Sequence, residues 1–457
     1  MIKKFIQKVF GFGAKRKPAS AHSVIPVERH GVRRDSLSRG SHKVCEVLQQ
    51  AGFSAYVVGG AVRDILLGVK PKDFDVATNA SPEEVHKLFR RSRLIGRRFK
   101  LVHVMFGSET VEVSTFRAGD ASVTDEHGRV LRDNVFGSRE DDAARRDFTV
   151  NALYYDPSTE TILDFHNGLR DIKHKSVRII GDPRARFRED PIRMLRAARF
   201  AAKLDFTIDD RTREPIAEMA DLIGNVPAAR VFDEMIKLLL SGHAKPCVVG
   251  LRKAGLHHGL LPMLDVILEQ PMGEKFVMLA LDQTDQRVLA GKPVSPAFLF
   301  GALLWHEVLA AWKKFQQENH KPVPALHMAM DRVLDLQTEK LAIPRRYTTV
   351  IKEIWTMQPR FEQRSARRPF ALLANEKFRA GFDFMVLRAQ SGECPGELAD
   401  WWETFQHAAP DDRTDMLKAP EQGEKRPRRR RRPAGKGDKS GSGGESETRQ
   451  NSHGDAS

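Results

Sequence analysis

The chain has 457 residues, 41% of them hydrophobic, which is enough to bury more than one packed core, so several domains are expected. Lysine and arginine number 75 against 60 aspartate and glutamate residues, and the formal charge of +15 favours a polyanionic partner, first of all nucleic acid. Three scattered cysteines without a CxxC pair indicate neither a disulfide framework nor a zinc knuckle, and no apolar stretch predicts a membrane span or signal peptide, so we expect a cytoplasmic protein.

Residues 1–38 are predicted to form a basic, disordered arm. The first ten residues place apolar side chains at helical spacing opposite lysines, until Gly11 ends the pattern. So short a helix is marginal alone in water, which favours disorder. The alternative is peripheral contact with the inner face of the membrane through the anionic lipid surface.

Two regions with different predicted secondary structure follow this arm. Residues 39–165 mix short β-rich runs with helical ones, whereas residues 183–405 read almost wholly as amphipathic helices separated by glycine and proline. The change predicts an α/β head followed by an all-α region. Within the head, Ser81 as cap, Pro82 in the first turn and Glu84 at the capping-box position predict the start of a helix.

A unit of strand, Gly-Gly turn, helix and second strand over residues 56–78 is the strongest candidate for a site. Gly59 and Gly60 allow backbone N–H groups to approach a triphosphate where the helix begins. Arg63, one turn later, adds a positive charge. On its own, a Gly-Gly pair before a helix is more often only a tight turn.

The second strand carries two carboxylates. Side chains alternate along a strand, so Asp73 and Asp75 are expected on one face, about 7 Å apart. Such a pair can hold hard cations such as Mg²⁺, as two-metal phosphoryl transfer requires. An isolated pair of aspartates is more often a solvated strand end, but the preceding Gly-Gly unit favours a metal site. Glu112 faces opposite to Val111 and Val113 and is a candidate third metal carboxylate beside the pair.

Four motifs together resemble one known family. They are GGAVRDILLG, DFDVAT, RRDFTVNALYYD at 145–156 and REDPIRMLRAARFAAKL at 188–204, in this order over most of residues 40–240. The chain is similar to the bacterial poly(A) polymerase and tRNA nucleotidyltransferase group of the polymerase-β-like superfamily. The resemblance implies an α/β palm-like nucleotidyltransferase head followed by an all-α neck, body and tail region.

The resemblance and the composition together divide the chain into parts. The expected parts after the arm are the head at 39–165, a neck with the nucleotide-recognition helix at 166–240, an RNA-binding body at 241–410 and a disordered Arg-rich tail at 411–457. The tail has few apolar residues, which is typical of disorder. Its RNA-binding candidates are Arg426, Arg428, Arg429, Arg430, Arg431 and Arg432.

The resemblance also implies roles for single residues. Asp73 and Asp75 would hold two Mg²⁺ ions, with Mn²⁺ as the alternative, and Asp147 would join them as a catalytic residue. The nucleotide would be bound by Gly59, Gly60, Arg63, Arg146, Asp190, Arg193 and Arg196. The last three are spaced to form one charged stripe of a helix, which without the resemblance is more simply a salt-bridge ladder.

The implied activity is template-independent addition of AMP from ATP to the 3′-hydroxyl of RNA with release of pyrophosphate, which promotes RNA processing and decay. The stretch 91–107, with a basic GRRF turn before the strand carrying His103, resembles the poly(A) polymerase version of this region, and this resemblance favours the activity over the alternative of CCA addition to tRNA. An alternative of another class is an inactive RNA-binding scaffold. The expected partners are RNA 3′ ends and, further, RNA-decay or RNA-chaperone proteins; we expect a monomer that does not bind DNA.

Overall fold

The computed structural model describes residues 22–96, 100–118, 123–124, 130–132, 136–256 and 271–417. The chain forms two compact units, Met1–His407 and Ala408–Ser457. In the second unit the described part contains helix α22 (Pro410–Met416). No helix in the described ranges combines the length and apolarity needed to cross a membrane.

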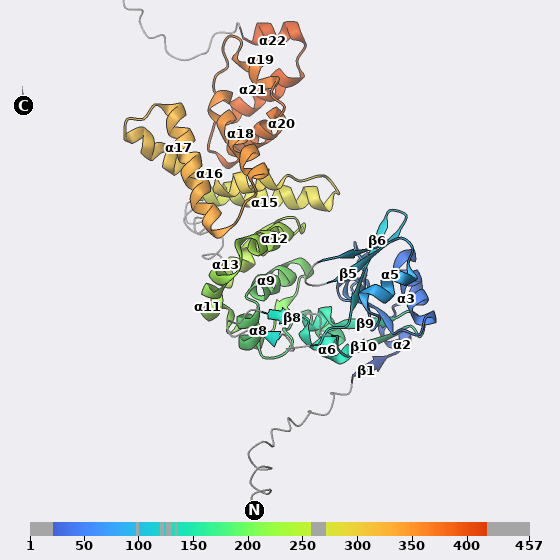
Figure 1. Cartoon of the computed structure of the whole chain (residues 1–457). Helices are drawn as coiled ribbons and strands as arrows, with labels where there is room; N and C mark the ends of the chain where they lie inside the picture. Colours follow the sequence, from blue (N-terminus) through green and yellow to red (C-terminus); the bar gives the residue numbers. More distant parts are fainter. Residues whose placement is uncertain are drawn as a thin grey trace, which may run out of the picture. The chain divides into compact units, whose positions relative to one another are not determined.

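A mixed sheet of eight strands organises the N-terminal part of the first unit (Figure 1). Its strands are β1 (Ser23–Ile25), β2 (Ala55–Val58), β3 (Asp75–Thr78), β4 (Ser92–Ile95), β5 (Leu101–Phe106), β6 (Glu109–Thr115), β9 (Leu153–Asp156) and β10 (Thr161–Asp164). They lie in the order β1-β10-β9-β2-β3-β6-β5-β4, and in this described sheet only β3 and β6 are parallel neighbours. Strands β7 (Val123–Thr124) and β8 (Val130–Arg132) form a separate pair.

Two helices, α3 (Arg39–Gln50) and α5 (Pro82–Leu88), pack on one face of the sheet (Figure 1). The strand side chains in this core include Val57, Val76 and Val113, all fully buried, because apolar residues recur at every second position. Helix α5 begins with the predicted capping box of Ser81 and Glu84. The opposite face carries a smaller apolar cluster that includes Tyr56, Val58 and Tyr154.

Four further short helices and two 3-10 turns complete the head. They are α2 (Val27–His30), η1 (Arg34–Ser36), α4 (Gly60–Leu66), α6 (Arg139–Arg145), η2 (Thr149–Asn151) and α7 (Gly168–Lys173). Helix α4 directly follows β2 and ends before Gly68, as the sequence predicts. The predicted α/β head is therefore confirmed.

The predicted disorder of residues 1–38 is wrong for residues 22–38. Strand β1 pairs with β10 from Ser23 to Ile25, and Arg34 donates its backbone N–H to Glu160. Three residues are too few to show the alternation that indicates a strand, and the pairing partner lies at the far end of the head sequence. Residues 1–21, where membrane contact is predicted, lie outside the described residues.

The next part is helical apart from two short strands that pair in parallel, β11 (Ser176–Val177) and β12 (Thr207–Ile208). Its helices are α8 (Pro183–Glu189), α9 (Ile192–Leu204), α10 (Asp210–Arg213), α11 (Ile216–Met219), η3 (Ala220–Asn225), α12 (Ala228–Leu239) and α13 (Ala244–Lys253). Helix α9 packs against both α12 and α13. The expected boundary between neck and body at residue 240 thus falls between helices that share one core.

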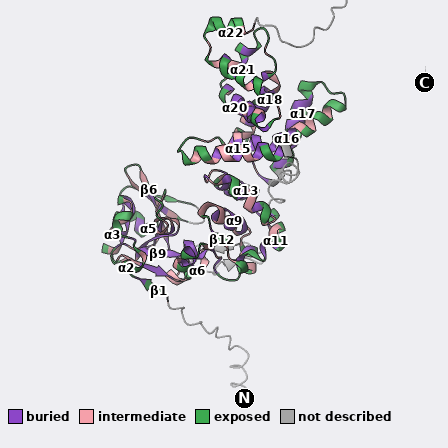
Figure 2. Cartoon of the chain, turned by 180° about the vertical axis from the view of Figure 1, so that it is seen from behind, coloured by how far each residue is buried: buried purple, intermediate pink, exposed green. Residues whose placement is uncertain are grey.

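The remaining helices that the structure describes in the first unit build the body. They are α15 (Pro271–Leu289), α16 (Pro296–Gln317), α17 (Pro322–Lys340), α18 (Arg345–Phe361), α19 (Arg368–Leu373), α20 (Phe378–Ser391) and α21 (Gly396–His407). Figure 2 shows buried and exposed residues mixed along these helices, as amphipathic helices require. Trp305, Trp355 and Trp402 are fully buried. The predicted all-α region is confirmed.

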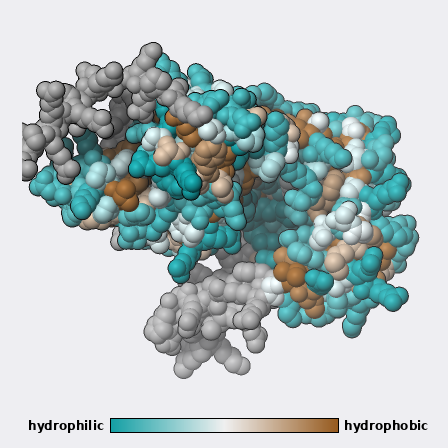
Figure 3. Space-filling view, turned by 90° about the horizontal axis from the view of Figure 1, so that it is seen from above, coloured by the Kyte–Doolittle hydropathy of each residue, from teal (hydrophilic) through white to brown (hydrophobic). Residues whose placement is uncertain are grey.

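The predicted tail also needs a correction at its start. Residues 411–416 were expected to be disordered, but they belong to α22. Residues 418–457, with all the tail arginines predicted to bind RNA, lie outside the described residues. Over the described surface seen in Figure 3, hydrophilic residues predominate and hydrophobic ones form small separate groups.

Candidate active site

A cavity of about 490 Å³ lies between the polar face of the sheet and the helices that follow the head. It brings together seven of the predicted site residues: Asp75, Glu112, Arg146, Asp147, Asp190, Arg193 and Arg196. The other predicted head residues, Gly59, Gly60, Arg63 and Asp73, are not among its described lining residues. Carboxylates on the sheet therefore face arginines on α9 across one space.

Asp75 and Glu112 form the acidic wall of this cavity. Asp75 begins β3 and is the register partner of Glu112 on the parallel strand β6, so both side chains point to the same face. Glu112 thus lies beside Asp75, where alternation predicts it, while its role as a metal ligand stays a prediction. Asp73 was expected on the same strand, but β3 starts only at Asp75. On the next strand, the Nε2 atom of His103 lies 3.6 Å from Oε2 of Glu112.

The pKa of Asp75 indicates whether the acidic wall suits a cation. Loss of hydration within the cavity, and then repulsion from Glu112, raise the pKa of Asp75 to about 6; Arg146 opposes this shift and Asp73 adds to it. The described residues contain no group of three His, Cys, Asp or Glu side chains arranged to hold an ion. Mg²⁺, however, usually takes one or two protein carboxylates together with substrate phosphates. The acidic wall therefore suits a hard divalent cation shared with a substrate.

The Gly-Gly turn lies behind the cavity. Gly59 has φ +74°, a conformation that favours glycine, and a Cβ there would lie 3.3 Å from Nη1 of Arg146. Gly60 starts α4. Arg63, predicted to contact the triphosphate, is 3% exposed, pairs with Asp64 at 2.6 Å and donates to Oδ1 of Asn151. Arg63 therefore supports Asn151 from behind.

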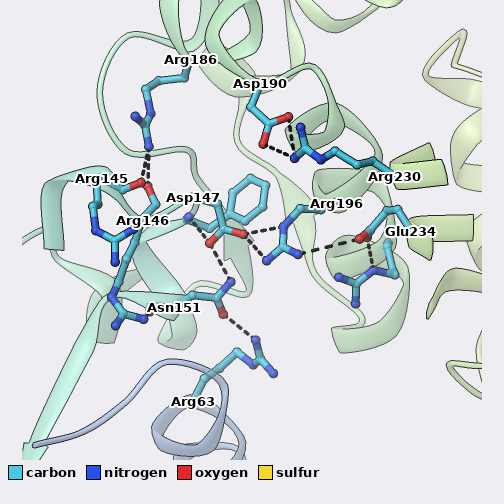
Figure 4. A network of polar contacts seen from close by, with 12 residues as sticks. Arg63, Arg145, Arg146, Asp147, Asn151, Arg186, Asp190, Arg196, Arg230 and Glu234 are labelled. Atoms are coloured by element: carbon cyan, nitrogen blue, oxygen red, sulfur yellow. Dashed lines mark hydrogen bonds and ion pairs between the residues drawn. The ribbon is translucent and has the colours of Figure 1, made fainter. Parts of the chain in front are cut away.

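Asp147 anchors an arginine. Its Oδ2 accepts a hydrogen bond from Nε of Arg196 at 2.8 Å and lies 2.6 Å from Nη2 of the same side chain (Figure 4). Its Oδ1 accepts from Nδ2 of Asn151 at 3.1 Å and from the backbone N–H of Phe148 at 2.7 Å. Burial opposes ionisation, but the charge of Arg196 and these hydrogen bonds lower the pKa of Asp147. Asp147 is thus a fixed anion at the cavity wall.

Arg146, the neighbour of Asp147, is held on the head. Its Nε donates to the hydroxyl of Tyr154 at 2.9 Å, and its Nη2 lies 3.2 Å from Oδ2 of Asp142. The guanidinium also lies over the Tyr154 ring, 5.1 Å from the centroid. Arg146 still lines the cavity, so it presents a fixed positive charge to whatever occupies this space.

Asp190, Arg193 and Arg196 were predicted to lie on one helix. Arg193 and Arg196 lie on α9, but Asp190 does not. Asp190 lies in the turn between α8 and α9 with an extended backbone, because the following residue, Pro191, disfavours helical geometry before it. Its carboxylate accepts two hydrogen bonds from Arg230 of α12, at 3.0 and 3.2 Å (Figure 4). Nη1 of Arg193 donates to Glu189 and to the backbone oxygen of Arg186, both at 2.8 Å.

Sequence reasoning missed one whole wall of the cavity, which α12 provides. The lining residues not predicted are Val58, Ser114, Arg117, Arg145, Ile192, Arg230, Asp233, Glu234 and Lys237. In α12, Asp233 and Glu234 lie three and four residues after Arg230, and Lys237 lies four and three after them, so all four share one helix face. This spacing is visible in the sequence, but nothing in the sequence links that face to the head.

Comparisons with known proteins agree with this geometry. Residues 55–178 match the poly A polymerase head domain, 205–268 a family described as "Probable RNA and SrmB-binding site of polymerase A", and 317–436 the polymerase A arginine-rich C-terminus. The poly(A) polymerase I of Salmonella typhi is 43% identical over 438 residues, covering 91% of this chain and 94% of the relative.

Proteins named for CCA addition are similar over less of the sequence or at lower identity. The CCA-adding enzyme of Lactobacillus helveticus is 38% identical over 202 residues, covering 44% of this chain and 50% of the relative. The crystal structure of the Bacillus stearothermophilus CCA-adding enzyme in complex with CTP has a TM-score of 0.52 and 26% identity, covering 83% of this chain and 87% of that chain. Because its similarity to a poly(A) polymerase I extends over almost the whole sequence, the chain belongs to the bacterial poly(A) polymerase I family.

Proposed function

We propose that this protein is a template-independent poly(A) polymerase that adds AMP from ATP to the 3′-hydroxyl of RNA. The observation that carries the proposal is the cavity in which sheet carboxylates face the arginines of α9 and α12, in a chain that matches a poly(A) polymerase I over 91% of its length. The triphosphate of a nucleotide needs cations, and its base needs directed hydrogen bonds. The carboxylates of the sheet would hold a metal ion for the triphosphate, and the arginines would donate hydrogen bonds to the base.

The acidic wall is the proposed place for Mg²⁺. Asp75 and Glu112 would hold it, with Asp73 just before β3 as a further oxygen donor. The raised pKa of Asp75 supports this assignment, since the repulsion between neighbouring carboxylates is what a bound cation relieves. When bound, Mg²⁺ neutralises charge on the phosphates and favours the ionised form of the attacking hydroxyl.

The chain's own cationic residues would bind and orient the nucleotide. Arg146 carries a fixed charge toward the phosphates, and Arg193 and Arg196 offer planar sets of N–H donors to the base. In the proposed reaction the RNA 3′-oxygen forms a bond to the α-phosphorus of ATP as the bond to the β-phosphate oxygen breaks. Pyrophosphate leaves, and the hydroxyl proton is released to the solution. Without a template, the protein side chains must select the base.

CCA addition to tRNA is the second candidate. It is favoured by a CCA-adding enzyme that is 38% identical over 44% of this chain, and by the shared fold of an enzyme bound to CTP. The two activities differ in the nucleotides used and in where addition stops, so one assay separates them.

The test is a primer-extension assay with an end-labelled RNA oligonucleotide, Mg²⁺ and each nucleoside triphosphate supplied singly. A parallel reaction uses a tRNA without its CCA end. A poly(A) polymerase gives long products with ATP alone on the plain oligonucleotide. Products that stop after three nucleotides on the tRNA and require CTP would assign CCA addition instead, and no extension of either RNA would contradict both activities.

A further inference from the structure

Three guanidinium groups surround the ring of Phe200 on α9. The charged carbons of Arg63, Arg196 and Arg199 lie 5.2, 5.3 and 4.4 Å from the ring centroid. Arg63 and Arg199 are almost buried and Arg196 is 30% exposed, so these positive charges repel one another unless anions balance them. Asp64 pairs with Arg63, as described above.

Glu234 of α12 supplies the anion for Arg199. Its Oε1 accepts a hydrogen bond from Nε of Arg199, and the two side chains are only 4% and 9% exposed. Its Oε2 lies 3.8 Å from Nη1 of Arg196, which is an ion pair without a hydrogen bond (Figure 4). One buried carboxylate therefore faces both arginines.

Arg196 is consequently held between carboxylates from two distant parts of the sequence. Nε and Nη2 contact Asp147 of the head, whereas Nη1 faces Glu234 of α12. Arg196 lines the cavity, and its Nη1 makes no short hydrogen bond to Glu234. The N–H groups of Nη1 can therefore donate to a ligand in the cavity. Glu234 thus faces the one edge of the Arg196 guanidinium that Asp147 does not hold.

We propose that Glu234 is a positioning residue for nucleotide selection, acting through Arg196. This inference rests on the proposed function, because it assigns Arg196 to the nucleotide cavity. Without the charge on Glu234, Arg199 would lose its anion and Arg196 would lose the second of the two carboxylates that face its guanidinium group. Arg196 would then lose its single orientation, and the donors that distinguish adenine from cytosine would no longer be fixed in space.

The test uses Glu234→Gln, which keeps the size of the side chain and an acceptor oxygen for Arg199 but removes the charge. Steady-state KM and kcat are measured for ATP and for CTP, and equilibrium binding of each nucleotide is measured by calorimetry. We expect KM for ATP to rise, and the preference for ATP over CTP to fall, each about tenfold or more, with a smaller change in kcat. Glu234→Asp, which restores the charge, is expected to recover part of the preference.

The matched control is Glu393→Gln in the body, which removes another nearly buried carboxylate. Glu393 is 10% exposed and accepts a hydrogen bond from Nε of Arg388 at 2.6 Å. Both Gln variants are expected to lower Tm, but Glu393→Gln should leave the nucleotide preference unchanged. If Glu234→Gln lowers Tm to a similar extent yet keeps the wild-type preference within twofold, Glu234 has only a structural role and the inference is wrong.

The proposed function is tested separately by the wild-type protein. If the wild type extends RNA with ATP and Glu234→Gln keeps its selectivity, only the positioning role fails. If the wild type does not use ATP, the proposed function fails. In that case calorimetry still decides the inference, since unchanged affinity of Glu234→Gln for both nucleotides would contradict a role in positioning Arg196 at the cavity.

Discussion

Asp75 and Glu112 are register partners on the two parallel strands of the head sheet, so their carboxylates share one wall of the cavity. Their mutual repulsion is part of what raises the pKa of Asp75. In the absence of a bound cation, this arrangement opposes folding slightly at neutral pH. A charge at Asp75 is therefore kept at some cost to stability, which is typical of functional sites.

Replacing Asp75 with Asn is expected to abolish RNA extension without lowering Tm in metal-free buffer. The change removes a cation ligand while relieving the repulsion from Glu112 and Asp73. Differential scanning fluorimetry with EDTA, combined with the extension assay, tests both parts. More than a tenth of wild-type activity in this variant, or in Asp73→Asn, would contradict the assignment of the metal site.

Replacing Arg193 with Ala should reduce the preference for ATP over CTP and GTP by about one to two orders of magnitude, and should affect RNA binding less. Arg193 lines the cavity and is held by Glu189 and the Arg186 backbone. Competition between labelled nucleotides in the extension assay measures the preference. Arg213→Ala, in an exposed pair with Asp210, is the control. If Arg193→Ala and Arg213→Ala had the same preference for ATP, Arg193 would have no role in base selection and would only form surface ion pairs.

Replacing Asn151 with Ala should destabilise the protein by about 1–3 kcal/mol, because buried donors and acceptors would lose a partner. Asn151 links Arg63 to Asp147 through its two amide atoms. Urea denaturation measures the free energy of unfolding. Gln283→Ala, which removes an exposed bond to Gln390, should change it by less than about 0.5 kcal/mol. If Asn151→Ala also lowered the free energy of unfolding by less than about 0.5 kcal/mol, the hydrogen bonds of Asn151 to Arg63 and Asp147 would contribute little to stability.

As the pH is lowered from 7 to 5, His306 should reduce the free energy of unfolding, whereas Asp75, whose pKa is raised to about 6, should increase it. Burial lowers the pKa of His306 below its ordinary value of 6.5, although Glu393 partly opposes this. The unfolded state therefore takes up the proton first, so the contribution is present above about pH 6.5 and is lost as the pH falls through the folded-state pKa. Between pH 7 and 5, His306→Leu should therefore lose less free energy of unfolding than His407→Leu, which changes an exposed histidine. If the free energy of unfolding varied with pH identically in the two variants, His306 would not contribute to the pH dependence.

Deleting residues 421–457 should weaken RNA binding at low salt and flatten its salt dependence. The deletion removes six closely spaced arginines, and each phosphate neutralised on a single strand contributes about −0.7 to the slope of log K against log salt. A decrease of roughly two to four in the magnitude of the slope is expected from titrations at several salt concentrations. Single-turnover addition at saturating RNA should hardly change. An unaltered slope would assign the tail to another partner.

The head and its acidic wall could be predicted because their signals are local. Alternation was sufficient to predict that Glu112 faces away from Val111 and Val113, although its place beside Asp75 depends on the pairing of β3 with β6, and a capping box was sufficient to start α5 at Pro82. Even the break before α9 had a local signal, since a proline follows Asp190 directly. Family resemblance added which of these local features belong to one site.

The rest depends on contacts between residues far apart in the sequence, for which a single sequence has no periodic signal. Glu234 reaches the cavity only because α12 packs on α9, and the burial of Arg63 depends on Asn151 and Phe200. An arginine beside a Gly-Gly turn is compatible with either a phosphate ligand or a buried support. Only the packing around Arg63 distinguishes the two.

Strand β1 has a consequence for handling the protein. It covers the outer edge of β10, from Ile162 to Asp164, with three backbone pairings. A shortened chain that began at residue 39 would keep every residue of the cavity but expose a row of unpaired N–H and C=O groups along β10. Such free strand edges associate with one another, so this shortened chain should aggregate at concentrations at which a chain beginning at residue 22 stays dispersed.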